Sequence, residues 1–285
     1  MNKIPVWKTI RFAYAFAFGD IGTIIGLIWL PTLLIALLQF LPYALGTLAV
    51  DQDSGNAAGA AVANLLFYAA GLILFAMNAV VVMRQALGLR QGGATVHFAL
   101  GLPEWRMLGA NLICAIILGA LLLAYLLGVL FATSLAKTLT AGVAIGTLLY
   151  LSTGICILVY VSLRLVFLVV PVVVAEDKID LARGWTLTAG NFWRIVAVML
   201  AVSLPLLAIQ LVATIAIGGA QLIAPLPVGQ DAMAAALNTR MMSLDKHMPE
   251  LIGLFLILAP FNFGLTLGAE AAAYRAIVPP SGRRT

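Results

Sequence analysis

Long apolar stretches separated by short polar segments run along most of the 285-residue chain. A helix needs about 20 mostly apolar residues to cross a hydrocarbon core of ~30 Å. Six stretches meet this length, and they cover residues 21–46, 58–83, 107–133, 139–164, 194–218 and 251–274. Their apolar residues are continuous rather than alternating, which favours helices over a membrane β-barrel. The pattern predicts an all-α integral membrane protein, 1–285, with six transmembrane helices arranged as three hairpins.

The composition leads to the same class of protein. Hydrophobic residues make up 63% of the chain, charged residues only 9%, and the mean hydropathy is +1.10. A soluble domain carries roughly 25% charged residues. With so few charges the chain cannot cover a water-facing surface, so lipid must solvate most of it.

The positive charges fall mainly on one side of the predicted spans. Thirteen of the 16 Lys and Arg residues lie there: Lys3, Lys8, Arg11, Arg84, Arg90, Arg106, Arg164, Lys178, Arg183, Arg194, Arg275, Arg283 and Arg284. The opposite side has Lys137, Arg240 and Lys246. The positive-inside rule therefore places both termini of this multi-pass protein in the cytoplasm. The net charge of +5 reports this topology; no folded basic domain supports nucleic-acid binding.

The N-terminal segment WKTIRFAYAF, residues 7–16, has aromatic residues interleaved with Lys and Arg. This pattern is typical of a helix that lies in the membrane interface. The apolar run after it is longer than the ~7–15 residues of a signal-peptide core, so we expect the segment to be retained.

The chain shows weak internal similarity between units 1–90, 91–175 and 176–285. Trp105 and Arg106 open the third span in the same way as Trp193 and Arg194 open the fifth. Each unit would hold an interfacial segment, an outward span, a loop and a returning span. The alternative is a similarity that any membrane protein shares.

The segment 170–199 interrupts the apolar pattern with a proline and a group of charges. Residues 139–175 as one helix would be about 55 Å long, far more than the bilayer core. We expect a hinge at Pro171, because proline removes a backbone donor and clashes with the preceding turn.

A short interfacial helix is predicted after this hinge. It would have Leu181, Trp185 and Thr188 on one face, and Gly190 would end it. Asn191 is expected to cap the next span by accepting hydrogen bonds from its free N–H groups. The tryptophans expected to anchor the chain at headgroup depth are Trp7, Trp105, Trp185 and Trp193.

The apolar run ended by a proline, the acidic exit and the segment DLARGWTLTAGNFWRI, residues 180–195, resemble a diverse bacterial group of six-span proteins. The group includes the membrane domain attached to glycerophosphoryl diester phosphodiesterases and related stand-alone membrane proteins. The resemblance implies an inner-membrane protein of envelope maintenance. Because this chain has no polar segment long enough for a soluble catalytic domain, phosphodiesterase activity does not follow.

Polar residues inside membrane spans are costly and often functional. Glu270, Asn78 and Asn111 each lie five or six residues from an arginine that ends or begins a span, and Arg164 ends the fourth span. We predict that these four side chains, with Arg194 as a further candidate, form a cytoplasm-facing polar pocket for an anionic headgroup or solute. The structural alternative is an ion pair with interhelical hydrogen bonds.

The long outer loop, 219–250, carries an apolar stripe, Met233, Leu237, Met241 and Leu244, and predicts a helix on the outer leaflet. A copper(I) site at Met233, Met241, Met242, His247 and Met248 is the alternative, but no tight Met-x-Met run supports it. No metal or cofactor is predicted. Cys114 and Cys156 lie inside apolar spans and are expected to be free.

No motif of a hydrolase, zinc protease or nucleotide-binding enzyme occurs in the chain. The sequence therefore predicts a non-enzymatic protein that serves lipid or envelope homeostasis, or acts as an accessory or scaffold subunit of a membrane complex. Its expected partners are membrane lipids and a further membrane protein. The alternative is a small-solute or lipid transporter, which the scarcity of buried carboxylates besides Glu270 disfavours.

Overall fold

In a computed structural model of the protein, residues 3–44, 57–90, 98–136, 141–225, 227 and 229–278 are described, and their regular elements are all helices. These are α1 (Val6–Gly19), α2 (Ile21–Ala44), α3 (Ala57–Ala86), α4 (Leu102–Ala136), α5 (Ala141–Val166), α6 (Val169–Glu176), α7 (Leu181–Thr188), α8 (Phe192–Gly218), the 3₁₀ turn η1 (Ala220–Leu222), α9 (Gln230–Lys246) and α10 (Met248–Ile277). The all-α class is thus confirmed for this part of the chain.

Six segments of these helices are long and apolar enough to cross a membrane. They are Ile21–Leu38, Ala61–Ala86, Leu102–Ala132, Ile145–Glu176, Phe192–Gly218 and Met248–Ile277. Each overlaps one of the six spans predicted from the sequence. The chain is therefore a multi-pass membrane protein by the length and composition of its helices.

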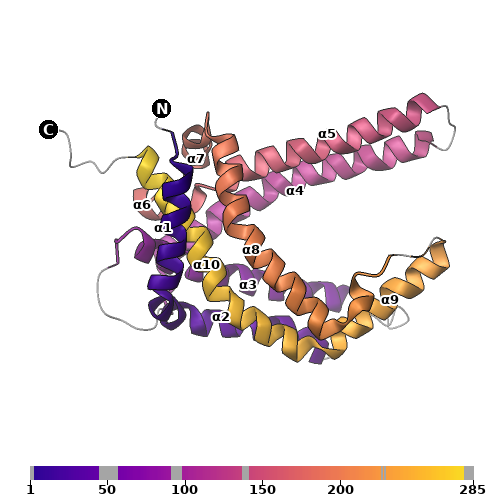
Figure 1. The fold of residues 1–285 in the computed structure, drawn as a ribbon, viewed down its shortest axis with the longest axis horizontal. Helices are drawn as coiled ribbons and strands as arrows, with labels where there is room; N and C mark the ends of the chain where they lie inside the picture. Colours follow the sequence, from indigo (N-terminus) through magenta and orange to yellow (C-terminus); the bar gives the residue numbers. More distant parts are fainter. Residues whose placement is uncertain are drawn as a thin grey trace.

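The start of α1 and the end of α10 lie at the same end of the molecule, together with α6 and α7 (Figure 1). This end is called the terminal end below. The outer ends of α4 and α5 and the helix α9 lie at the opposite, distal end. Along the chain, α2 contacts α3, α4 contacts α5, and α8 contacts α10.

The fourth predicted span is broken one turn before the expected hinge at Pro171. Helix α5 ends at Val166, and α6 begins at Val169 after a turn at Phe167 and Leu168. Pro171 lies inside the first turn of α6, where a backbone N–H has no intrahelical acceptor. Its ring would clash with the carbonyl of Phe167 in a continuous helix, so the chain turns at that residue instead.

Helix α10 lies at the centre of the terminal end and takes part in two apolar clusters. Its residues Leu267 and Ala271 pack with α2, α3, α4 and α6. Its residues Ala269 and Ala273 pack with α1, α6, α7 and α8. These two clusters form the packed core, which lies at the terminal end.

Helix α1 crosses α10 at two glycines of α10. A Cβ at Gly264 would lie 3.0 Å from Ala17 Cβ, and one at Gly268 would lie 3.3 Å from Ala13 Cα. Small residues on both helices thus permit the close approach. A Cβ added at Gly22 of α2 or at Gly146 of α5 would, in contrast, have no atom within 4 Å.

Helices α4 and α5 form a long arm that extends from the terminal end to the distal end (Figure 1). Only 6% of an apolar 18-residue window within Leu102–Ala132 is buried inside the protein. Two tyrosines hold the arm together: the rings of Tyr125 and Tyr150 stack with centroids 5.8 Å apart. Each ring also covers a glycine of the other helix, Tyr125 at Gly154 and Tyr150 at Gly128.

Candidate functional site

The predicted pocket arginine Arg164 lies at the end of α5 and makes its hydrogen bonds to α5 and α7. Its Nη1 donates to Tyr160 Oη at 2.7 Å, Nη2 to the carbonyl of Trp185 at 2.8 Å, and Nε to Thr188 Oγ1 at 3.4 Å. The guanidinium carbon is 4.0 Å from the centre of the Trp185 ring and 5.5 Å from that of Tyr160. Within the described residues, no hydrogen bond or ion pair joins Arg164 to Glu270.

The arginine–aromatic cluster, defined as Tyr160, Arg164, Trp185, Phe192 and Trp193, continues from α5 and α7 onto the start of α8. The rings of Tyr160 and Phe192 are 4.8 Å apart, and those of Phe192 and Trp193 are 5.2 Å apart. Trp193 is 79% exposed. The cluster therefore combines a fixed cation with an aromatic rim that faces outward.

The short helix predicted after the hinge is confirmed as α7, which ends at Thr188, before Gly190. Leu181, Trp185 and Thr188 follow each other at spacings of four and three residues and so lie along one face of this helix, as predicted. Thr188 is buried, and Trp185 is half-buried with its ring over the guanidinium of Arg164. The sequence did not indicate this contact with Arg164.

Two other polar residues hold the N-terminal segment against α8. Asn191 Oδ1 accepts a hydrogen bond from the backbone N–H of Ile4 at 3.0 Å, and Arg194 Nη1 donates to the carbonyl of Ile4 at 2.7 Å. The predicted role of Asn191 as a side-chain cap of α8 is wrong, because its side chain makes no cap hydrogen bond. Arg194, predicted as a pocket residue, is likewise engaged in joining the N-terminal segment to α8.

The remaining pocket candidates are buried or half-buried within the helices. Asn78 Nδ2 donates to Thr32 Oγ1 at 3.1 Å and so joins α3 to α2. Asn78 Oδ1, Asn111 Nδ2 and Glu270 Oε2 are buried and have no hydrogen-bond partner among the described residues. No hydrogen bond links Asn78, Asn111 and Glu270 to each other in the part of the chain that the structure describes.

A second polar cluster, the elbow, consists of Glu176, Asp177, Lys178, Asp180 and Arg183 between α6 and α7. Glu176 Oε1 accepts a hydrogen bond from Tyr274 Oη of α10 at 3.1 Å. Its carboxylate also pairs with Lys178 at 3.3 Å and with Arg183 at 3.4 Å. Glu176 thus connects α6, α7 and α10.

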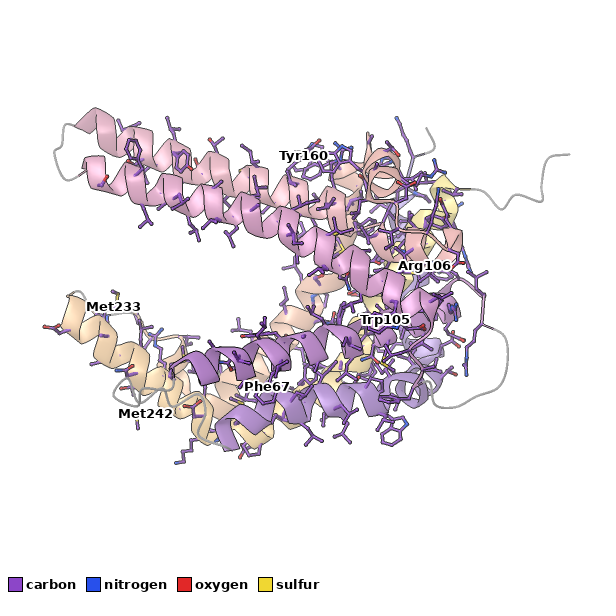
Figure 2. The ribbon with its side chains drawn as sticks, turned by 180° about the vertical axis from the view of Figure 1, so that it is seen from behind. Phe67, Trp105, Arg106, Tyr160, Met233 and Met242 are labelled. Atoms are coloured by element: carbon purple, nitrogen blue, oxygen red, sulfur yellow. The ribbon has the colours of Figure 1, made fainter. Side chains whose placement is uncertain are left out.

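The elbow also reaches the arm. Asp177 ends α6 in the left-handed conformation with φ of 53°, and its carboxylate forms an ion pair with Arg106 of α4. In Figure 2, Arg106 and its exposed neighbour Trp105 lie at the terminal end of α4. The local sequence around Glu176 and Asp177 gives no indication of their partners on α4 and α10.

Mutual hydrogen bonds perturb two exposed groups of the elbow. The pKa of Asp180 is lowered, first because its side chain accepts a hydrogen bond from the backbone N–H of Arg183, and then because of Lys178. The pKa of Lys178 is raised by its contacts with Asp180 and then with Glu176. Asp180 is at the same time the side-chain N-cap of α7.

The predicted anchors Trp7, Trp105 and Trp193 are all more than half exposed, whereas Trp185 is partly covered by its contact with Arg164. On α9, the residues Met233, Leu237 and Met241 of the predicted stripe are exposed. Met233 and Met242 lie toward different ends of this helix, and this spacing argues against one copper site (Figure 2). No group of three His, Cys, Asp or Glu residues suited to a metal is found among the described residues. Cys114 and Cys156 are both free.

Comparison of the chain with protein-family models, curated proteins and solved structures gave no match in any of the three. The resemblance to the bacterial six-span group therefore stays a prediction. The structure by itself defines the class, which is a multi-pass helical membrane protein.

Proposed function

We propose that the chain is a non-enzymatic protein of the bacterial inner membrane that acts as a scaffold or accessory subunit in lipid or envelope homeostasis. In this proposal its spans form three hairpins, and both termini and the elbow lie in the cytoplasm. Such a role also agrees with the expected kinship to the stand-alone members of the six-span group.

One observation carries the proposal: three of the five polar side chains expected to line a pocket serve instead as links between segments of the chain. Arg164 joins α5 to α7, Arg194 joins the N-terminal segment to α8, and Asn78 joins α3 to α2. Polar side chains commonly hold membrane helices together in this way. The two predicted cations therefore position segments of the chain and do not stand free in a shared pocket.

The exposed surface of the arm, α4 and α5, is a second observation in favour of a scaffold role. It exposes large apolar side chains along its length, among them Ile116, Leu123, Leu130, Ile145 and Leu148. A chain that only had to span the membrane could bury more of this surface against its own helices. The exposed arm instead offers a long surface to lipid or to another membrane protein.

One specific observation favours the alternative function, a transporter. Within the part of the chain that the structure describes, Asn78 Oδ1, Asn111 Nδ2 and Glu270 Oε2 are buried without hydrogen-bond partners. Unsatisfied polar atoms are costly in a membrane interior, and they are frequent in ion and substrate pathways. A transporter should lose its activity in Glu270→Gln while the protein still folds.

Native mass spectrometry of the protein extracted gently with its surrounding lipid tests the proposal. A stoichiometric protein partner or retained phospholipid is expected, and Glu270→Gln should leave this retention unchanged. Gly146→Ala serves as a control variant, since nothing lies within 4 Å of Gly146. Recovery of the bare chain, together with solute uptake that depends on Glu270, would favour the transporter instead.

A further inference from the structure

The guanidinium of Arg164, unlike those of Arg106 and Arg183, has no carboxylate partner among the described residues. Arg106 pairs with Asp177, and Arg183 pairs with Glu176. In the described part of the chain, Arg164 interacts only with a hydroxyl of tyrosine, a hydroxyl of threonine, a backbone carbonyl and two rings. Its positive charge is therefore fixed in place without a counter-ion from the protein.

Donor capacity remains on this guanidinium. Arginine has five N–H donors in a planar fork, and the three hydrogen bonds of Arg164 use three of them. Stacking on Trp185 at 4.0 Å holds the plane of the fork in one orientation. A phosphate is the anion that this arrangement suits, because it accepts paired hydrogen bonds from a guanidinium edge.

The surroundings of Arg164 favour a lipid as the source of that phosphate. On the face of α5 that carries Arg164, Ile157 lies two turns away in the direction of the distal end and is exposed. On the other side, the exposed indole of Trp193 is linked to the cluster through Phe192. Tryptophan side chains prefer the headgroup depth of a bilayer, where an apolar ring meets a polar layer.

We propose that the arginine–aromatic cluster binds one anionic glycerophospholipid, with its phosphate at the Arg164 guanidinium and its acyl chains along the exposed face of α5. The inference rests on the proposed function only in requiring that the chain lies in a bilayer. It specifies the lipid class and the site, neither of which the scaffold proposal defines.

Lipid-dependent thermal stability of the purified full chain in detergent tests the site directly. A ligand that binds only the folded protein raises the melting temperature with its concentration. Phosphatidylglycerol should therefore raise the Tm of the wild-type protein in a saturable manner, and phosphatidylcholine should do so much less. Arg164→Lys should weaken the phosphatidylglycerol effect by about tenfold in half-saturating concentration, since an ammonium does not reproduce the planar fork.

Two tryptophan variants allow the site to be tested even if Arg164→Lys does not fold. Trp193→Ala removes an exposed ring of the cluster and is expected to weaken phosphatidylglycerol binding severalfold. Trp7→Ala removes a ring of similar exposure, 75% against 79%, from α1 and should leave binding unchanged. Equal loss in both variants would overturn the site.

The remaining outcomes also decide the question. Equal stabilisation by phosphatidylglycerol and phosphatidylcholine would overturn the preference for an anionic lipid. Stabilisation by inorganic phosphate that saturates at the same site would show a soluble anion as the ligand and overturn the lipid assignment. Because the assay uses the isolated chain, failure of the scaffold proposal for lack of a protein partner would not affect its result.

Discussion

Several polar side chains in this protein form hydrogen bonds with residues that are distant in the sequence. Asn191 accepts from Ile4, and Glu176 accepts from Tyr274 of α10. The contact of Asn191 satisfies the backbone N–H of the buried Ile4, and an unpaired donor is costly in an apolar interior. The terminal end is thus held by a small number of polar links over an apolar core.

At the residue scale, Asp180→Ala is expected to lower the melting temperature near neutral pH, because it removes the N-cap of α7 and the contact with Lys178. The pKa of Asp180 is lowered in the folded state, so its contribution is present above the ordinary value of about 4 and is lost as the pH falls through the folded-state pKa. The difference in Tm between wild type and variant, measured in detergent as a function of pH, checks this.

Lys178 sets the upper limit of the pH range in which its contact with Asp180 stabilises the fold. Its pKa is raised, so its contribution to stability is present below about pH 10.4 and is lost as the pH rises through the folded-state pKa.

Asp180→Asn is the matched control for Asp180→Ala, because asparagine is also a good N-cap but does not titrate. A Tm difference for Asp180→Ala that stays constant down to strongly acidic pH would contradict the assignment.

At the element scale, glycine decides how closely helices approach. In the arm, Gly128 and Gly154 leave room for the rings of Tyr150 and Tyr125, and the Tyr125 hydroxyl donates to the carbonyl of Leu151 at 3.1 Å. At the terminal end, Gly264 and Gly268 do the same for α1. Small residues thus allow close packing of α4 with α5 and of α1 with α10.

Gly128→Ala and Gly154→Ala are each expected to destabilise the pairing of α4 with α5 by about 1–3 kcal/mol, the usual cost of overpacking. The new Cβ would overlap the tyrosine of the other helix, so the ring must leave its stacked position. Unfolding in detergent, followed by tyrosine-sensitive near-ultraviolet circular dichroism, measures the effect.

Gly119→Ala on α4 and Gly146→Ala on α5 are the controls, because no atom lies within 4 Å of either new Cβ. These two variants should be neutral or slightly stabilised, since alanine favours a helix over glycine by up to about 1 kcal/mol. If all four variants behave alike, the tyrosine–glycine contacts do not hold the arm.

On the scale of the whole molecule, the packed core lies at the terminal end, and the arm and α9 extend to the distal end (Figure 1). The arm is joined to the core near its base, where Arg106 reaches Asp177. This arrangement gives the protein one firmly packed end and long helices whose exposed surfaces are largely apolar.

The proposed topology places α7 and α9 on opposite sides of the membrane. With both native cysteines replaced, Ala232→Cys on α9 should react with a membrane-impermeant maleimide in spheroplasts, whereas Ala182→Cys on α7 should react only in inverted vesicles. Both positions are exposed in the structure, so access to the reagent, and not burial, determines the result. Labelling of both from the same side would refute the topology.

The six spans were predictable because each is a local property. The site was predictable only in part: Arg164 and Trp185 were recognised as candidates, but their stacking on each other was not. The break at Phe167 was placed a turn late, at Pro171, because the sequence shows the proline but not which backbone carbonyl its ring excludes. The elbow was missed, since the partners of Glu176 and Asp177 lie on helices distant in sequence.

The sequence by itself determined the helical class and the six membrane-crossing segments, because lipid offers no hydrogen bonds and each apolar stretch must satisfy its own backbone. It also determined which residues are charged at the ends of the spans. Only the tertiary structure decided that Arg164 lies against Trp185 and that Asn191 holds the N-terminal segment. Those contacts depend on how helices separated by many residues are placed against each other, and the apolar pattern carries no information about that placement.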